Sequence, residues 1–101
     1  MKVKEINETN FKEEVLNGEK VLVDFNATWC GPCRMLKPII DEFSETSEVK
    51  ICSIDVDQCP NLASEYNIYS IPCLILFENG TEIKRNIGLM QIDDIKEFVG
   101  E

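Results

Sequence analysis

The chain has 101 residues, of which 44% are hydrophobic, and it carries a formal net charge of −9 without any histidine. This length supports one hydrophobic core but not two ordinary domains, so we expect a single domain over residues 1–101. The acidic balance argues against a nucleic-acid partner, because such proteins gain most of their affinity from Lys and Arg contacts. The lack of histidine removes the commonest metal ligand and the usual catalytic base, which leaves cysteine and carboxylate for any chemistry.

The sequence also argues against a membrane protein and against a secreted one. The longest apolar run, residues 74–77, is far shorter than the roughly 20 residues that cross a bilayer. The lysines in residues 1–5 are followed by no apolar stretch or cleavage site of a secretory signal. Five cysteines are an odd number, which fits poorly with a secreted disulfide framework. We therefore expect a cytoplasmic protein whose cysteines are reactive or reduced thiols.

Short apolar runs alternate with helical patterns along the chain, which predicts an α/β architecture. An edge strand over residues 3–6 precedes a helix over residues 9–16, which Asn17-Gly18 ends. The apolar run over residues 20–26 predicts a central strand buried on both faces, although Asp24 interrupts it.

A long amphipathic helix is predicted over residues 30–47, because apolar residues recur there at helical spacing. Pro38 should kink this helix, since proline removes a backbone donor and clashes with the preceding turn. Asn79-Gly80 is typical of a hairpin turn. The remaining patterns predict strands over residues 49–56, 73–77 and 81–87, and helices over residues 60–66 and 92–99.

The tetrapeptide Cys30-Gly31-Pro32-Cys33 joins the central strand to the long helix, which places both sulfurs at a helix N-terminus. Unsatisfied N–H groups at that end favour a thiolate, so Cys30 is the candidate nucleophile. Gly31 and Pro32 make a tight connection, and Pro32 costs no hydrogen bond in the first turn. Cys33, one turn further in, is the candidate resolving thiol. The Cys30 thiolate would attack a substrate disulfide, and Cys33 would then displace the reduced product.

Two alternatives to dithiol chemistry are half of a zinc site and a chance pair of cysteines. A zinc site normally recruits a second pair at suitable spacing, whereas Cys52 and Cys59 are seven residues apart. We therefore expect no metal and favour the redox interpretation, because the pair lies next to βαβ units.

Seven landmarks in order resemble the thioredoxin family over almost the whole chain. They are Val23-Asp24-Phe25, Trp29-Cys30-Gly31-Pro32-Cys33, Pro38, Asp55-Val56-Asp57, Ile71-Pro72, Phe77-Glu78-Asn79-Gly80 and Gly88. The resemblance implies an α/β thioredoxin fold, with a central five-stranded mixed β-sheet flanked by four α-helices. It also implies an oxidoreductase that passes electrons from a thioredoxin reductase to protein disulfides. Such a protein is expected to be a monomer that binds no cofactor and works through a redox-active Cys30–Cys33 disulfide.

The resemblance further implies roles for individual residues. Asp24 matches a buried acid of the family. Desolvation should raise the pKa of this acid, and the acid would exchange a proton with Cys33. The alternative is that Asp24 is a purely structural acid. Pro72 matches a cis-proline facing the sulfurs, where backbone groups pair with an extended substrate. The apolar docking surface would comprise Trp29, Gly31, Pro32, Ile71, Ile87 and Gly88 beside Pro72. For Ile87 the alternative is a place in the core.

Three positions depart from the family pattern. Asn26 stands where a second tryptophan is common, and Ser53 stands where a lysine usually lies near the buried acid. We therefore expect Asp24 to be more desolvated and less compensated by charge than in typical members. Cys73 stands where threonine is more frequent.

The cysteines outside the tetrapeptide are expected to have different surroundings. Cys73 is either a small buried strand residue or a thiol near the reactive pair, able to form another disulfide, take glutathione or complete a three-thiolate metal site. Cys52 is expected in the core. Cys59, just before Pro60, is expected to be more exposed and open to modification, or a surface spectator.

Two rival functions remain. One is a dedicated electron donor for a single client, such as a peroxiredoxin or a reductase subunit, with Asn26, Ser53 and Cys73 reflecting that specialisation. The other is a binding module in which the fold serves as a subunit and the cysteines are incidental. Loss of disulfide reduction in Cys30→Ser would separate the enzyme from the binding module.

Overall fold

The computed structural model describes residues 3–101, so Met1 and Lys2 of the predicted domain lie outside the described residues. The predicted elements are all present, and their ends differ from the predictions by at most two residues. In chain order they are β1 (Val3–Glu5), α1 (Phe11–Val15), β2 (Val21–Asn26), α2 (Gly31–Thr46), β3 (Lys50–Asp55), α3 (Pro60–Glu65), β4 (Cys73–Glu78), β5 (Thr81–Ile87) and α4 (Ile92–Val99).

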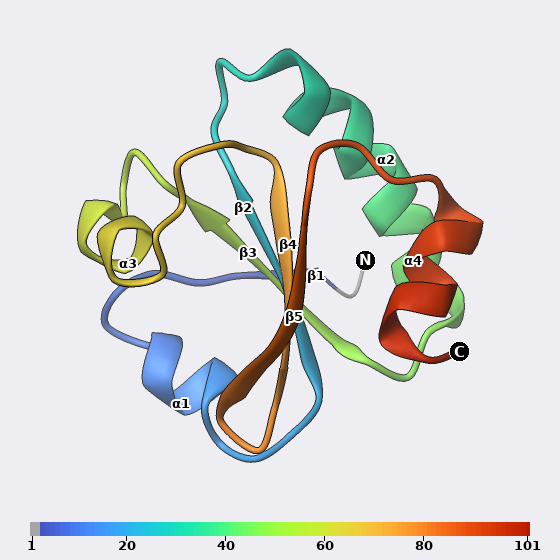
Figure 1. The fold of residues 1–101 in the computed structure, drawn as a ribbon, viewed down its shortest axis with the longest axis horizontal. Helices are drawn as coiled ribbons and strands as arrows, with labels where there is room; N and C mark the ends of the chain where they lie inside the picture. Colours follow the sequence, from blue (N-terminus) through green and yellow to red (C-terminus); the bar gives the residue numbers. More distant parts are fainter. Residues whose placement is uncertain (1–2) are drawn as a thin grey trace.

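The strands form one mixed sheet in the order β1-β3-β2-β4-β5 (Figure 1). Strands β1, β3 and β2 run parallel, whereas β4 pairs antiparallel with both β2 and β5. The β4–β5 turn places Asn79 and Gly80 at positive φ, the conformation that an Asn-Gly hairpin favours. The predicted five-stranded mixed sheet with four helices is thus confirmed.

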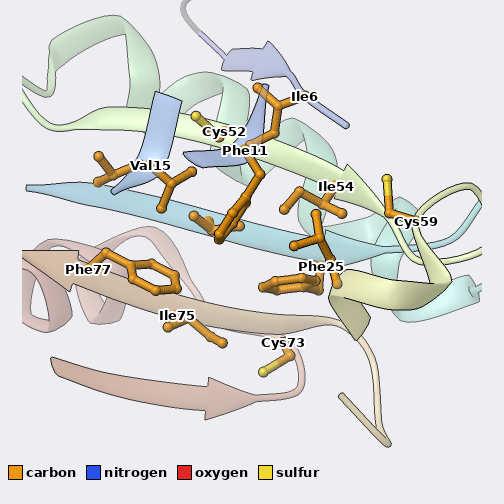
Figure 2. Packing of buried hydrophobic residues seen from close by; sticks show 13 residues of the cluster. Ile6, Phe11, Val15, Phe25, Cys52, Ile54, Cys59, Cys73, Ile75 and Phe77 are labelled. Atoms are coloured by element: carbon orange, nitrogen blue, oxygen red, sulfur yellow. The ribbon is translucent and has the colours of Figure 1, made fainter. Parts of the chain in front are cut away.

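The helices cover the two faces of the sheet in pairs, as Figure 1 shows with the sheet seen nearly edge-on. Helices α1 and α3 pack on one face, which we call the α1/α3 face, and α2 and α4 pack on the other, the α2/α4 face. Alternation along β2 divides its side chains accordingly, because successive residues of a strand point to opposite faces. Val23 and Phe25 lie in the core of the α1/α3 face, where Figure 2 labels Phe25, and Leu22 lies in the core of the α2/α4 face.

This alternation puts Asp24 on the same side as Leu22, beneath helix α2. In the sheet Asp24 lies opposite Ser53 of β3 and Leu74 of β4. Helix α2 continues as one helix through Pro38, so the kink predicted there stays a prediction. Within residues 3–101, no helix has both the length and the apolar character that a membrane crossing needs.

Candidate active site

The reactive pair lies where β2 passes into α2. Cys30 and Cys33 form a disulfide, with their Cα atoms 5.2 Å apart. Cys30 is the N-cap residue of α2, and the backbone N–H of Cys33 donates a hydrogen bond to Cys30 Sγ at 3.2 Å. Pro32 occupies the first turn, where its missing N–H breaks no helical hydrogen bond. The predicted placement of both sulfurs at a helix N-terminus is confirmed.

A loop distant in sequence faces these sulfurs. The Ile71-Pro72 peptide bond is cis, and the carbonyl oxygen of Ile71 lies 3.9 Å from Cys30 Sγ. The N–H of Gly88 donates to the carbonyl oxygen of Pro72 at 2.8 Å, which ties the end of β5 to the same loop. Ile71 also packs against the small cluster that contains Cys30 and Cys33. The fold therefore brings together the tetrapeptide, the cis-proline loop and Gly88.

The predicted docking surface is mostly accessible. Trp29 is 66% exposed and Ile87 is 60% exposed, so the alternative that Ile87 belongs to the core is wrong. Gly31 and Pro32 are exposed, while Ile71 and Gly88 are half-buried. Trp29 and Ile87 thus offer exposed apolar surface, whereas the disulfide itself is buried.

Trp29 has a polar partner that sequence reasoning did not assign. Its indole N–H donates to Asp57 Oδ2 at 2.7 Å. Asp57 follows β3, and the carboxyl ends of the parallel strands β2 and β3 meet at the same edge of the sheet. The sequence offered a signal for this contact, because Asp57 is one of the landmarks and follows the strand next to the one that leads to Trp29.

Asp24 is a buried acid behind the disulfide. Its side chain is only 6% exposed, and burial raises the pKa of its carboxyl to about 6, as predicted. The Asn26 amide and the ammonium group of Lys37 offset part of that increase in pKa. Within residues 3–101, Asp24 Oδ1 has no hydrogen-bond partner and Asp24 forms no salt bridge.

The two short residues beside Asp24 bind one another. The Asn26 side-chain amide donates to Ser53 Oγ at 2.8 Å and to the backbone carbonyl oxygen of Asp24 at 3.1 Å. Neither of these two bonds is to a carboxylate oxygen of Asp24, although the Asn26 amide lies near enough to lower the pKa of that carboxyl. A cavity of about 420 Å³ adjoins these residues, and both Asp24 and Cys33 line it.

The other three cysteines, Cys52, Cys59 and Cys73, are free and buried in the α1/α3 core (Figure 2). The core position of Cys52 and the buried alternative for Cys73 are confirmed. Cys73 pairs with Phe25 in the sheet and shares its face, the side opposite Asp24 and α2. Among residues 3–101, no group of three or more His, Cys, Asp or Glu side chains is placed to hold a metal.

The predicted exposure of Cys59 is wrong, since this residue is only 1% exposed. Cys59 is the N-cap residue of α3 but makes no side-chain cap hydrogen bond. Glu8 Oε2 instead accepts hydrogen bonds from the N–H groups of Asn61 and Leu62. With those backbone donors satisfied by Glu8, the Cys59 side chain packs in the α1/α3 core.

A disulfide that links the N-cap of a helix to its first turn, faces a cis-proline and lies on a mixed sheet defines a dithiol/disulfide oxidoreductase. The comparisons agree. A family model described as Thioredoxin matches residues 2–101. The chain belongs to the thioredoxin family, and its activity is dithiol/disulfide exchange.

Individual relatives share most of the chain. A thioredoxin of Rickettsia felis is 44% identical over 99 residues, which span 95% of this chain and 94% of that protein. A thioredoxin of Synechocystis sp. is 46% identical over 87 residues, which span 83% of this chain and 81% of that protein. The solved structure of a mutant thioredoxin from Halobacterium salinarum NRC-1 superposes with a TM-score of 0.90 at 32% identity, covering 97% of this chain and 88% of that one.

Proposed function

We propose that this protein reduces disulfides of client proteins with electrons from a thioredoxin reductase, with Cys30 as the nucleophile and Cys33 as the resolving thiol. The observation that carries this assignment is the position of Cys30 at the N-cap of α2, where the Cys33 N–H points at its sulfur. A helix N-terminus stabilises negative charge, so the reduced Cys30 is favoured as a thiolate.

The exchange runs in two displacements. The Cys30 thiolate attacks one sulfur of the client disulfide, an S–S bond forms between Cys30 and the client, and the other client sulfur leaves as a thiolate. Cys33 then loses its proton and attacks Cys30 Sγ, which releases the second client thiolate and closes the Cys30–Cys33 disulfide. Two electrons have passed to the client, and the reductase returns two to the pair.

Asp24 is the proposed acceptor of the Cys33 proton. It lines the same cavity as Cys33, and a carboxyl with a pKa of about 6 is suited to exchange protons near neutral pH. Burial disfavours the ionised form of this carboxyl, because the charge is poorly solvated there. The carboxylate therefore accepts a proton more readily than that of an exposed aspartate. Asp24 is therefore proposed as the general base of the resolving step.

The client is proposed to bind across Trp29, Gly31, Pro32, Ile71, Ile87 and Gly88. Trp29 precedes Cys30 and Ile87 precedes Gly88, and both offer exposed apolar surface to a client. The cis Pro72 holds the Ile71 backbone beside Cys30, where an extended client segment can pair with it. We further propose a single-domain monomer in the cytoplasm, since buried free thiols such as Cys52 persist in a reducing compartment.

An insulin-disulfide reduction assay coupled to thioredoxin reductase and NADPH tests this function. The parent should turn over, Cys30→Ser should lose turnover, and Cys33→Ser should accumulate a mixed disulfide detectable by mass spectrometry. Cys52→Ala is the matched control, because it removes a thiol from the opposite face and should keep parental turnover. Full turnover by Cys30→Ser would overturn the proposal and favour a binding module.

A further inference from the structure

The cavity beside Asp24 is separate from the proposed client surface. It lies between helix α2 and strands β1, β3 and β2, and neither Trp29 nor Ile87 lines it. Its volume of about 420 Å³ is within the range typical of sites for small organic molecules. Asn26 and Ser53, which are short and bonded to one another, form part of its wall.

The cavity contains an unused acceptor. The Asp24 carboxylate lines it, is more than nine-tenths buried, and has no partner for Oδ1 within residues 3–101. The two hydrogen bonds of the Asn26 amide go to Ser53 Oγ and to the Asp24 backbone carbonyl oxygen, so they leave Oδ1 without a donor. A buried carboxylate with an unpartnered oxygen is unfavourable, so a ligand that donates to the Asp24 carboxylate from the cavity would offset part of that cost.

The charge of the lining favours a cationic ligand. Glu5, Asp24 and Asp55 line the cavity without a salt bridge in the described part of the chain. The lining holds fewer cations than carboxylates. Lys37 pairs with Asp41 at 3.5 Å, and Arg34, whose Nη1 donates to the Thr28 carbonyl oxygen at 3.1 Å, keeps its charge. One cation thus remains against the three carboxylates.

The cavity also has an apolar wall, formed by Val3, Ala27 and Ile40. We propose that this cavity is a binding site for a small organic cation, whose amidinium or guanidinium head group donates to Asp24 while its apolar body packs against Val3, Ala27 and Ile40. Such a head group is planar and carries several N–H donors, which suits a carboxylate acceptor. The bound cation lies beside Cys33 and holds Asp24 in its ionised form.

Benzamidine is a suitable probe, and benzamide is its neutral counterpart of similar shape. Amide shifts of the ¹⁵N-labelled oxidised protein, followed during titration, should give benzamidine at least about tenfold higher affinity than benzamide, because only the cation forms a charge-assisted hydrogen bond. The shifts should centre on α2, β1 and β3 around Asp24. This measurement needs no turnover, so it can fail or succeed independently of the proposed function.

The pH dependence provides a second readout. The titratable and charged groups that share the cavity lining with Asp24 are Cys33, Arg34, Lys37 and Asp41 of α2, Asp55 of β3 and Glu5 of β1, and Cys73 of β4 lies on the opposite face of the sheet. Since the cation binds the ionised carboxyl, its affinity should fall about tenfold between pH 7.5 and pH 5. Asp24→Asn should weaken binding at pH 7.5 by about tenfold and abolish most of this pH dependence.

A charge placed in the cavity should compete with the ligand. Ser53→Lys introduces an ammonium group there and should eliminate benzamidine binding, whereas Ser64→Lys adds the same charge on the exposed surface of α3 and should leave it intact. The Asp24→Asn result stands alone if Ser53→Lys does not fold. Absence of binding, equal binding of benzamidine and benzamide, or unchanged affinity in Asp24→Asn would overturn the proposal.

Discussion

The five cysteines occupy two regions that differ in polarity more than in burial. Cys30 and Cys33 lie at the N-terminus of α2, next to a backbone N–H donor and a buried acid. The remaining three lie among aromatic and aliphatic side chains on the α1/α3 face (Figure 2). All five are buried, so low exposure alone does not identify an inert cysteine. The donors around the sulfur decide which of them reacts.

The pKa values of the three core thiols follow from this difference. Burial raises the pKa of Cys52 to about 11, and it also raises the pKa values of Cys59 and Cys73. A thiol reacts as its thiolate, so these groups are protected twice, by the packing around them and by their protonation.

The largest expected effect is therefore a difference in alkylation rate. In the reduced protein at pH 7.5, iodoacetamide should modify Cys30 at least about 100-fold faster than Cys52, because the increase of the Cys52 pKa from 9.0 to about 11 alone lowers its thiolate fraction by about that factor. Peptide mapping over time measures both rates. In concentrated urea the five rates should converge, and modification of Cys59 or Cys73 at the Cys30 rate in the folded protein would contradict the comparison.

The buried Asp24 carboxyl beside Cys33 should lower the free energy of unfolding at neutral pH, whereas the three core cysteines carry no such charge. The folded-state pKa of Asp24, about 6, lies above its ordinary value of 3.8, so the folded protein binds the proton more tightly than the unfolded one. The contribution of Asp24 to stability is therefore largest below about pH 4, falls between about pH 4 and pH 6, and stays reduced above that range. We expect Asp24→Asn to stabilise the fold by about 2–3 kcal/mol at pH 8 and by little at pH 3.5.

Urea unfolding at the two pH values, in the oxidised state, measures this difference. Glu42→Gln is the control, because Glu42 is exposed on α2, does not line the cavity and forms no salt bridge among the described residues. A stabilisation by Asp24→Asn that is equal at both pH values would show that burial does not raise the pKa of this carboxyl.

The same substitution at two cysteines should separate stability from reactivity. In the reduced protein, Cys52→Ser buries a hydroxyl in an apolar cluster and should cost about 1–3 kcal/mol. Cys30→Ser should change stability by less than about 0.5 kcal/mol, because serine is a favourable N-cap residue. Denaturant unfolding under dithiothreitol compares them, and insulin reduction should show the opposite order of loss. If Cys52→Ser and Cys30→Ser destabilised the protein equally, the two regions would not differ in how much their cysteines contribute to stability.

The elements of the fold were predictable because their signals are local. The continuous apolar run of β2, the helical spacing in α2 and the Asn79-Gly80 turn each lie within one segment. The tetrapeptide likewise contains most of the information about Cys30 and Cys33. The sheet order and the cis state of Pro72 were available only through resemblance to a family, since neither is encoded by local periodicity.

What the sequence did not reveal depends on contacts between distant segments. Cys59 looked exposed because a Cys-Pro step at a helix start is often at the surface, but Glu8, far away in the chain, satisfies the backbone donors of α3 and Cys59 packs inward. The cavity beside Asp24 requires four elements to be in place. The Trp29–Asp57 hydrogen bond requires the register of β2 and β3.

That last contact gives the smallest expected effect and tests the exposed side of the reactive region. Asp57→Ala removes the acceptor of the Trp29 indole, and because both side chains are exposed the free energy of unfolding should change by less than about 0.5 kcal/mol. Trp29 is the single tryptophan of the chain, so its fluorescence anisotropy reports directly on the loss of restraint and should decrease. Asp93→Ala in α4 removes the same charge elsewhere and should leave the anisotropy unchanged. If Trp29 positions clients, Asp57→Ala should also raise the KM for insulin with little change in kcat, because the surroundings of Cys30 are intact. An unaltered anisotropy would show that the indole is held by packing rather than by Asp57.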